Sequence, residues 1–258
     1  MAVIKKFRIK SFKEQETLLQ LDNISMFYDK RRILNDISFK VNRSEVLGLL
    51  GPNGVGKSTI FKIIMNIEQQ KGGKIFLKGV DCTNLPIHER SSNFHLSYCP
   101  QYGGYFYDLT VFENLTAVAE LHIKEKNLRI SKIDKIVGQF GFDSILNVKA
   151  KHVSGGERRK LAIGMAIIND PEILLLDEPY AALDILSIKM IQEIIINLQS
   201  MEKMSIIVCD HNARDLLTCV DRAIVLSNGK IIASGSPQEI INDTHARSVY
   251  FGNEFKIN

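Results

Sequence analysis

The chain has 258 residues, of which 45% are hydrophobic and 24% are charged, a composition that suits one large folded domain with a sizeable core. Its 33 basic and 29 acidic residues leave a formal net charge of +4, which is too small to indicate nucleic-acid binding. No apolar run reaches the roughly 18 residues of a membrane-spanning helix, and no secretory signal opens the chain, so we expect a cytoplasmic location.

The N-terminal segment is strongly basic. The stretch KKFRIKSFK, residues 5–13, interleaves lysines and an arginine with apolar residues ahead of the first predicted strand. We interpret residues 1–16 as a basic extension to a folded domain that spans residues 17–258. Contact of this extension with an anionic membrane surface is the alternative.

The first hundred residues are predicted to be rich in β-structure. Alternating apolar residues or short apolar runs predict five strands, at residues 18–28, 33–41, 46–50, 74–77 and 96–99. The first two alternate over their whole length, which is typical of an antiparallel pair. The third stops at a glycine-rich loop, and a helix from Lys57 to about Ile67 follows that loop.

A helical segment follows the fifth strand. Apolar residues recur there at helical spacing, at Val111, Leu115, Val118 and Leu121, and strand signals are few up to about Phe140. We therefore expect a helical subdomain at about residues 100–160.

The second half of the chain has the β–α–β order of a parallel sheet. Strands at residues 173–176 and 205–209 are separated by a helix at about 185–199. Asn228-Gly229 lies between two further apolar runs and predicts a hairpin, and residues from about 236 to 258 form a C-terminal tail. The fold class is therefore α/β, with an antiparallel β part and a helical part added to a parallel sheet.

The cysteines offer no sign of metal or redox chemistry. They show neither a CxxC pair nor metal-ligand spacing. We expect reduced thiols that serve as small packing residues, namely Cys82, Cys99, Cys209 and Cys219.

The loop after the third strand fits a phosphate-binding pattern. Its residues match G-x-x-x-x-G-K-[ST], and a strand before it and a helix after it supply the context that a chance match lacks. The glycines let backbone N–H groups surround a phosphate, the lysine reaches the terminal phosphates, and Ser58 can ligate Mg²⁺. We expect this loop to bind the nucleotide through Gly51, Pro52, Asn53, Gly54, Val55, Gly56, Lys57, Ser58 and Thr59.

Two carboxylates end the strand of ILLLDEP, residues 173–179. Taken alone, Asp177 and Glu178 are more simply explained as surface charges. Beside a phosphate loop, we expect Asp177 to hold the magnesium shell, through water, and Glu178 to polarise the water that attacks the γ-phosphorus.

Two further polar residues follow predicted parallel strands. His211 comes after the strand at residues 205–209, and Gln101 comes after the strand at 96–99. The carboxyl ends of such strands gather ligand groups, so the His211 imidazole is a candidate donor to the γ-phosphate. Gln101 is a candidate to position water or Mg²⁺. The alternatives are that His211 has a structural role and that Gln101 only caps a loop.

The segment VSGGE, residues 153–157, opens another helix with glycines. Ser154 and Glu157 have the spacing of a capping box, which by itself explains an ordinary helix start. Gly155 and Gly156 weaken the first turn, however, and this cost is explained if the backbone N–H groups approach a bulky anion closely. We therefore interpret the segment as a second anion site.

Six ordered motifs resemble the nucleotide-binding subunits of ABC transporters over nearly the whole chain from about Thr17: GPNGVGKST, Gln101, VSGGE, LLLDE, the ALD of residues 182–184, and His211. The resemblance implies a P-loop NTPase fold with a RecA-like core, an antiparallel β subdomain and a helical subdomain. It implies ATP hydrolysis with Mg²⁺. It also implies that two copies pair head to tail, so that Ser154, Gly155 and Gly156 contact the partner's ATP.

The same resemblance assigns an adenine-stacking role to Tyr28, which otherwise is simply a tyrosine at a strand end. Two departures from the family pattern occur. Val153 stands where leucine is usual, and we expect its side chain to pack without touching phosphate. The usual serine before Leu183-Asp184 is missing, which leaves Asp184 as the dependable residue of its motif.

A closer resemblance lies in the C-terminal half. SGGERRK, DEPYAALD, DHNARDLL and the closing VYFGNEF are similar to the ATPase subunits that power lipopolysaccharide export in Gram-negative bacteria. This implies a peripheral location on the cytoplasmic face of the inner membrane. ATPase subunits of branched-chain amino-acid importers share DHN-like features and are the alternative. A soluble non-transport ABC ATPase is a third reading, but the tandem cassettes or long coiled-coil insertions of that class are missing.

The stretch YGGYFYD, residues 102–108, places aromatic side chains around two glycines. The resemblance implies that integral membrane permease subunits dock here, near Tyr105 and Phe106. Aromatic loop residues usually pack inward, but glycine-flanked ones at a subdomain boundary are good interface anchors. Tyr107-Asp108 stands where the export family has a basic residue.

Overall fold

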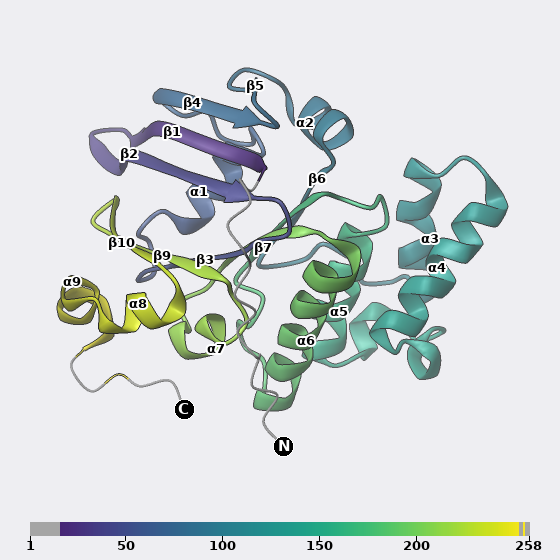
Figure 1. The fold of residues 1–258 in the computed structure, drawn as a ribbon. Coiled ribbons are helices and arrows are strands. Elements are labelled where there is room, and N and C mark those ends of the chain that lie inside the picture. The colour runs from purple at the N-terminus through teal and green to yellow at the C-terminus, as the bar shows by residue number, and fades with distance from the viewer. Residues whose placement is uncertain (1–15, 253–254, 256–258) are drawn as a thin grey trace.

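The computed structural model describes residues 16–252 and 255, so the predicted basic extension, apart from Glu16, lies outside the described residues. Two β-sheets are arranged one above the other (Figure 1). The first is antiparallel, with the order β2-β1-β4-β5. Its strands are β1 (Thr17–Tyr28), β2 (Arg31–Asn42), β4 (Gly72–Leu77) and β5 (Val80–Asp81).

The second sheet is mainly parallel, with the order β10-β9-β3-β8-β7-β6. Only β10 runs antiparallel, in the predicted hairpin, where Asn228 and Gly229 both have positive φ. Since β3, β8, β7 and β6 are parallel neighbours, their carboxyl ends share one edge. The strands are β3 (Val46–Leu50), β6 (Leu96–Cys99), β7 (Ile173–Asp177), β8 (Ser205–Cys209), β9 (Arg222–Ser227) and β10 (Lys230–Gly235).

The parallel sheet separates two hydrophobic cores. Along β3, Leu47 and Leu49 face a core shared with the antiparallel sheet, whereas Val46 and Leu50 face a core shared with the helices on the opposite side. This burial on both faces explains why the parallel strands are continuous apolar runs. Helix α1 (Lys57–Ile64) packs between the two sheets (Figure 1).

The helical segment projects to one side of the sheets (Figure 1). Helix α3 starts at a complete capping box between Thr110 and Glu113, and α4 ends at Gly141, whose φ of 65° is left-handed. Both pack against α5. The segment contains α3 (Val111–His122), α4 (Lys126–Phe140), the 3₁₀ turns η1 (Asp143–Ile145) and η2 (Ala150–His152), and α5 (Gly155–Ala166).

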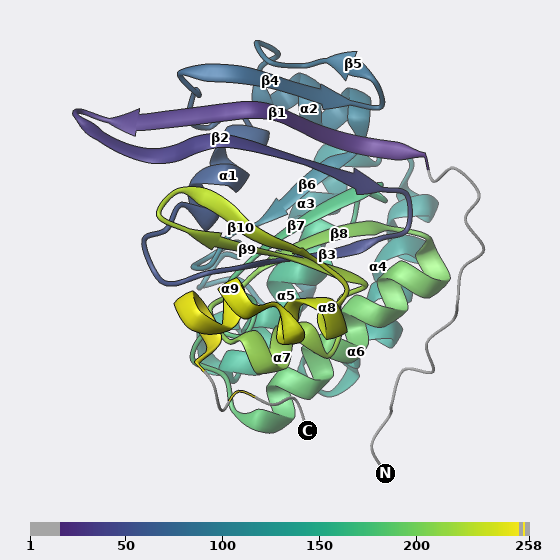
Figure 2. The same cartoon turned by 60° about the vertical axis from the view of Figure 1, so that its left-hand side comes forward.

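The remaining helices cover the lower face and the end of the parallel sheet. Figure 2 shows α8 and α9 beside β9 and β10, with α6 and α7 under the sheet. These helices are α6 (Ile185–Glu202), α7 (Ala213–Leu217), α8 (Pro237–Asn242), α9 (Thr244–Ala246) and a final π-turn, η3 (Arg247–Phe251).

Several local features differ from the sequence predictions, which did not include β5, α7, α8 or α9. Helix α1 ends at Ile64 and not near Ile67, because Asn66 adopts a left-handed φ of 55° and its amide donates to the Leu85 carbonyl at 2.9 Å. Helix α2 (Ile87–Phe94) was not predicted, since its only buried residues are Arg90 and Phe94 and it carries no apolar periodicity.

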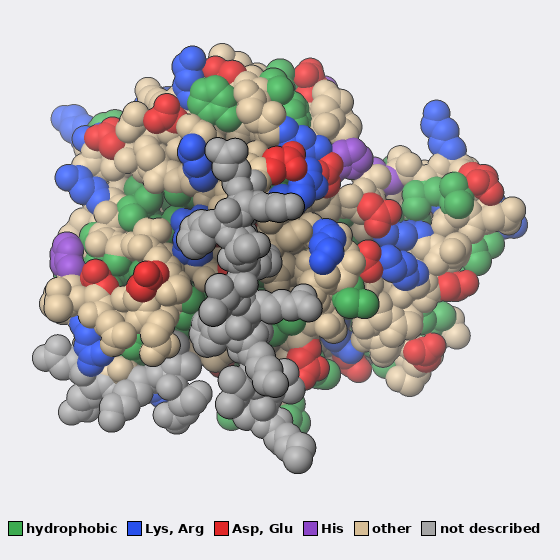
Figure 3. All heavy atoms as spheres, in the orientation of Figure 1, with side chains coloured by type: hydrophobic (Ala, Val, Ile, Leu, Met, Phe, Trp, Pro, Cys, Tyr) green, Lys and Arg blue, Asp and Glu red, His purple; other side chains and the backbone are tan. Residues whose placement is uncertain are grey.

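The surface mixes both signs of charge. On the face in Figure 3, basic and acidic side chains are interspersed among uncharged ones. Among the residues that the structure describes, none of the helices is both long and apolar enough to span a bilayer.

Candidate nucleotide-binding site

The loop between β3 and α1 has a backbone that only glycine tolerates at two places. Gly56 caps α1 with a φ of 108°, and a Cβ there would lie 2.6 Å from Leu34 Cδ2. At Gly51, with a φ of 151°, a Cβ would lie 2.6 Å from the Leu226 carbonyl oxygen. Both glycines are therefore required by close packing against β2 and β9 as well as by backbone conformation.

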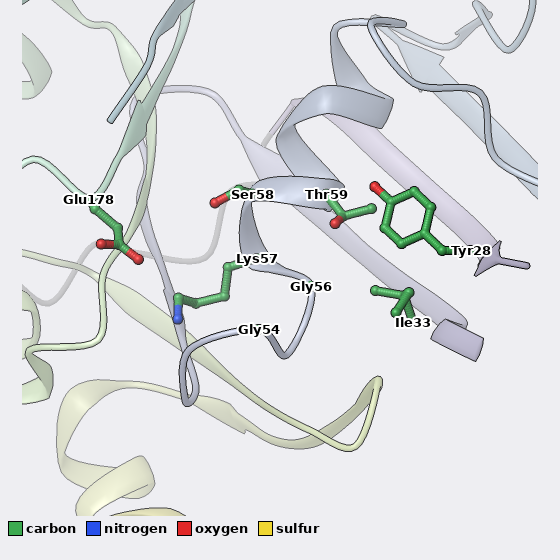
Figure 4. Close-up of a pocket in the computed structure, with 8 residues that line it drawn as sticks. All are labelled: Tyr28, Ile33, Gly54, Gly56, Lys57, Ser58, Thr59 and Glu178. Atoms are coloured by element: carbon green, nitrogen blue, oxygen red, sulfur yellow. The ribbon is translucent and has the colours of Figure 1, made fainter. Parts of the chain in front are cut away.

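A pocket of about 210 Å³ opens beside this loop. Figure 4 shows Tyr28 and Ile33 at one end of it and Glu178 at the other, with Lys57 and Ser58 between. Tyr28 donates a hydrogen bond to Glu68, which holds its ring at the mouth of the pocket. The complete lining is Tyr28, Ile33, Gly54, Gly56, Lys57, Ser58, Thr59 and Glu178.

Lys57 is 4% exposed, and its Nζ donates to the carbonyl oxygens of Gly51 at 2.7 Å and Pro52 at 3.1 Å. A buried ammonium is costly unless it is paired, and carbonyl oxygens satisfy its hydrogen bonds without cancelling its charge. The loop therefore holds a positive charge that fits the phosphates of a nucleotide.

Asp177, at the end of β7, is almost fully buried and accepts three hydrogen bonds. Its Oδ1 accepts from Ser58 Oγ at 2.9 Å and from Cys209 Sγ at 2.8 Å, and its Oδ2 accepts from the Tyr98 hydroxyl at 3.0 Å. Burial raises the pKa of both Tyr98 and Cys209, so both stay protonated and act as donors. The carboxylate is thus fixed by donors from β6, β8 and α1.

Glu178 follows Asp177 in a left-handed conformation, with a φ of 43°. Its Oε2 accepts a hydrogen bond from Gln101 Nε2 at 2.7 Å and lies 3.5 Å from His211 Nδ1. Glu178, Gln101 and His211 follow the ends of β7, β6 and β8 respectively, so the structure brings together the three residues proposed for catalysis. The His211 side chain is about half exposed.

The residues after β8 are tied to those after β7 by Asp210, which is fully buried. Its carboxylate accepts from the backbone N–H groups of Tyr180 at 3.2 Å and Asn212 at 2.9 Å. On the other side, the Tyr250 hydroxyl donates to the His211 carbonyl oxygen at 2.9 Å. The backbone around His211 is therefore fixed from both sides.

The start of α5 is a complete capping box, because Ser154 Oγ accepts from the Glu157 N–H and the Glu157 carboxylate accepts from the Ser154 N–H. The Ser154 backbone N–H is the main cause that lowers the pKa of Glu157. The residues from Ser154 to Gly156 do not line the pocket at the phosphate loop. Within one chain, the second glycine segment is thus separate from the first.

The two glycines of α5 differ in their surroundings. A Cβ on Gly156 would lie 2.4 Å from Ser187 Oγ, so this glycine is needed for the contact between α5 and α6. A Cβ on Gly155 would meet only Leu183 Cδ2, at an ordinary 3.6 Å. The sequence interpretation, which gave both glycines to anion binding, missed this packing role of Gly156. Val153 is buried in the core, as predicted.

Asp184 is the N-cap of α6. It accepts from the backbone N–H groups of Leu186 and Ser187, and from Ser187 Oγ at 2.7 Å. Its motif therefore packs directly behind the start of α5, through the same Ser187 that contacts Gly156.

The aromatic loop after β6 is fixed by Asn114, which is fully buried in α3. The Asn114 side chain accepts from the Phe106 N–H at 2.6 Å and donates to the Phe106 carbonyl at 3.0 Å. The Tyr105 ring packs on the core and against Tyr107, while Phe106 is 53% exposed. The loop thus presents Phe106 outward from a rigid base.

The donor set for a divalent cation is small. Among the described residues there is no group of three or more His, Cys, Asp or Glu side chains that could hold a metal. Ser58 and Asp177 supply adjacent hard oxygen atoms, 2.9 Å apart, at the end of the phosphate loop. This fits Mg²⁺, which typically takes one or two protein oxygens together with phosphate oxygens and water.

Sequence reasoning missed several residues that support the site: Tyr98, Cys209, Asp210, Arg159 and Asn114. The available signal was weak, because each is a polar residue at the end of an apolar strand or inside a helix. Cys209 had been given only a packing role. All four cysteines are free and buried, but the Cys209 thiol also contacts Asp177.

Taken together, a glycine-rich loop after a parallel strand, a buried lysine and a strand-end carboxylate beside a helix serine define a P-loop nucleoside triphosphatase. The ABC transporter family pattern matches residues 34–181, more than half of the chain. The chain belongs to the ABC transporter family and is an ATPase that binds ATP.

The chain is similar along most of its length to known members. It is 38% identical over 245 residues to the lipopolysaccharide export system ATP-binding protein LptB of Haemophilus influenzae, a match that covers 93% of this chain and 100% of the relative. The solved ADP conformation of MJ1267, an ATP-binding cassette of an ABC transporter, superposes with a TM-score of 0.83 at 24% identity, covering 92% of this chain and 99% of the other. A dimeric post-hydrolysis structure of the cassette MJ0796 with ADP and Pi superposes with a TM-score of 0.76 at 21% identity. This match covers 85% of this chain and 99% of the other.

Proposed function

We propose that this chain is the ATP-hydrolysing subunit of an ABC transporter that exports lipopolysaccharide. The observation that carries the proposal is the 38% identity to a lipopolysaccharide export ATPase across the full length of that relative. In this proposal residues 17–258 are one cassette, with a helical subdomain at about 100–160 and a C-terminal tail from about 236. ATP-driven pairing of two such cassettes powers the export.

The roles in the nucleotide site follow from the geometry. Tyr28 stacks on adenine at the mouth of the pocket, and the loop from Gly51 to Thr59 surrounds the phosphates. Lys57 exchanges its carbonyl contacts for the terminal phosphates. Ser58 and Asp177 are the residues that would hold Mg²⁺, which when bound neutralises charge on the phosphate oxygens.

Hydrolysis rests on Glu178. Its carboxylate accepts a proton from the attacking water as the bond to the γ-phosphorus forms. The Gln101 amide, 2.7 Å from Glu178, keeps that carboxylate turned toward the pocket. The His211 imidazole, 3.5 Å from the same oxygen, is placed to donate to the γ-phosphate.

Two copies pair head to tail, so that Ser154, Gly155 and Gly156 of one copy reach the nucleotide of the other. Their separation from the phosphate loop within one chain supports this arrangement. The N–H groups at the start of α5 lie at the positive end of a helix and suit an anion. A related cassette with ADP and Pi bound is dimeric, which supports the pairing of two copies.

Membrane permease subunits bind at the loop of Tyr105 and Phe106, which places the protein on the cytoplasmic face of the inner membrane. Phe106 is exposed on a base held by Asn114, as an anchor residue requires. Phe106→Ala is expected to weaken assembly by about 2 kcal/mol, the scale of an interface anchor, without changing ATP binding by the isolated chain. Normal assembly of the variant would remove this loop as the docking site.

The proposal is tested by purifying the tagged chain from detergent-solubilised membranes of its own organism and identifying its partners by mass spectrometry. Permeases of a lipopolysaccharide exporter are expected, and replacing the chain with Lys57→Ala should stop lipopolysaccharide from reaching the cell surface. Importer permeases, together with unchanged surface lipopolysaccharide, would contradict the assignment while leaving the ATPase activity intact.

A further inference from the structure

We infer that Arg159 is a positioning residue for hydrolysis, which holds the backbone of Gln101 and Glu178 in place and connects both to the start of α5. This inference rests on the proposed roles of these two residues. Arg159 lies in the second turn of α5 and is 9% exposed. Its side chain reaches the residues that follow β6 and β7.

The guanidinium donates only to neutral acceptors in its described contacts. Nη1 donates to the Pro100 carbonyl at 2.8 Å and contacts Cys99 Sγ at 3.9 Å. Nη2 donates to the Gln101 carbonyl at 2.6 Å and to the Glu178 carbonyl at 3.3 Å. A buried cation with this many acceptors fixes their relative positions, because each acceptor is bound to one rigid, planar group.

The contacts form a closed ring. Arg159 joins Gln101 and Glu178 through their backbone carbonyls, and the Gln101 amide joins the Glu178 carboxylate at 2.7 Å. The backbone on the N-terminal side of Glu178 is held as well, because the Glu178 N–H donates to the Cys209 carbonyl at 2.8 Å. Glu178 sits at a left-handed φ of 43°, a conformation that persists only where the surroundings hold it.

The ring connects two groups of one chain, Ser154 and Glu178, that are proposed to act on different nucleotides. Ser154 is five residues before Arg159 on the same helix, a rise of about 7 Å. In the proposed dimer, Ser154 contacts the partner's ATP, whereas Glu178 acts on the ATP of its own chain. A shift of α5 that accompanies contact with the partner's nucleotide is therefore passed by Arg159 to Glu178 and Gln101 of the same chain.

The first test separates positioning from folding. Arg159→Met keeps a long side chain but removes every donor, and its kcat is expected to fall on the order of 100-fold, the scale for misplacing a reacting group by about 1 Å. The ATP affinity of the isolated chain should stay within about twofold, because Lys57 and the phosphate loop do not contact Arg159. Hydrogen exchange of residues 100–107 should increase.

A matched control comes from the next residue of α5. Lys160 is also a long cation that donates to a backbone carbonyl, that of Phe140, but this contact lies inside the helical segment. Lys160→Met is expected to lower the melting temperature and to leave kcat within about twofold. If Arg159→Met does not fold, Arg159→Lys takes its place, because an ammonium lacks the planar fork and kcat should still fall about tenfold. An unchanged kcat in either folded variant overturns the inference.

The second test asks on which nucleotide Arg159 acts, by mixing variants with Lys57→Ala chains. In a mixed dimer with a Ser154→Arg chain, one nucleotide site combines the altered Lys57 of one chain with the altered Ser154 of the other. The second site carries neither change, so hydrolysis is expected to recover. With Arg159→Met chains, the site with an intact phosphate loop also contains the misplaced Glu178, so hydrolysis is not expected to recover. Recovery in the Arg159→Met mixture would show that Arg159 serves only the partner's nucleotide and would overturn the inference.

The two proposals fail in different ways. If mixed dimers form but the Ser154→Arg mixture shows no recovery, the head-to-tail arrangement is wrong. The loss of kcat at constant ATP affinity in unmixed Arg159→Met chains would still decide whether Arg159 positions Glu178 and Gln101.

Discussion

Helices α1 and α5 both start behind glycines, but their first turns lie in different surroundings. At α1, the first turn begins with the buried Lys57 and lines a pocket that Glu178 also lines. Asp177 lies beside this turn and accepts a hydrogen bond from Ser58. At α5, the turn is an exposed capping box whose second glycine packs against Ser187. The local signal, glycine at a helix N-terminus, is similar in both places.

The difference shows that a helix N-terminus becomes a nucleotide site only through the groups brought to it from elsewhere. At α1 these groups arrive within the same chain, because β8 lies next to β3 in the sheet and β7 lies next to β8. At α5 nothing comparable arrives from the part of the same chain that the structure describes, and we propose that a second copy supplies it. Five substitutions would test this contrast.

The two largest effects are expected on hydrolysis, and the first comes from Glu178→Gln at the α1 site. The amide keeps the shape of the side chain but cannot accept a proton, so kcat should fall by about 100-fold or more while ATP still binds. An ATP-dependent dimer should accumulate in size-exclusion chromatography. Hydrolysis at the wild-type rate would show that Glu178 is not the base.

At the α5 site, Ser154→Arg should leave ATP binding to the isolated chain intact but abolish hydrolysis and dimer formation. The cation enters the position proposed for the partner's phosphate, and it also breaks the capping box, a loss of about 1 kcal/mol. Ser154→Ala is the control, since it breaks the same capping box without adding bulk or charge. Equal loss of hydrolysis in both variants would assign the effect to the cap alone.

The two glycines of α5 should respond oppositely in stability. Gly156→Ala forces a Cβ against Ser187 and should destabilise the chain by about 1–3 kcal/mol in urea unfolding, and pairing it with Ser187→Gly should recover part of this loss. Gly155→Ala has room and should stabilise α5 by up to about 1 kcal/mol. If Gly155 contacts a partner's phosphate, its more stable variant should nevertheless hydrolyse ATP more slowly.

The smallest effect is expected from Tyr98→Phe, which removes one of the hydrogen bonds to Asp177. A loss of about 1 kcal/mol in orienting this carboxylate corresponds to about a fivefold rise in the Mg²⁺ concentration for half-maximal hydrolysis. Tyr102→Phe is the control, since the Tyr102 ring is highly exposed. An unchanged Mg²⁺ dependence would mean that Ser58 and Cys209 suffice to orient Asp177.

The sequence by itself determined the elements whose cause is local. Alternation predicted β1 and β2, the Asn-Gly turn predicted the β9–β10 hairpin, and the phosphate loop was evident from its glycines and lysine. The order of strand, loop and helix also predicted that Asp177 ends a parallel strand and that Gln101 and His211 follow two others. Short-range patterns of this kind need no knowledge of the remaining chain.

The tertiary structure alone decided which residues support those at the site. The sheet order places β6, β7 and β8 side by side, so that Tyr98 and Cys209 reach Asp177. Arg159 likewise reaches Gln101, which is more than fifty residues away in the sequence, and Glu178, which is about twenty residues away. These contacts leave no periodic trace, because each depends on one polar side chain in an apolar setting. The packing role of Gly156 is likewise invisible until α6 brings Ser187 against it.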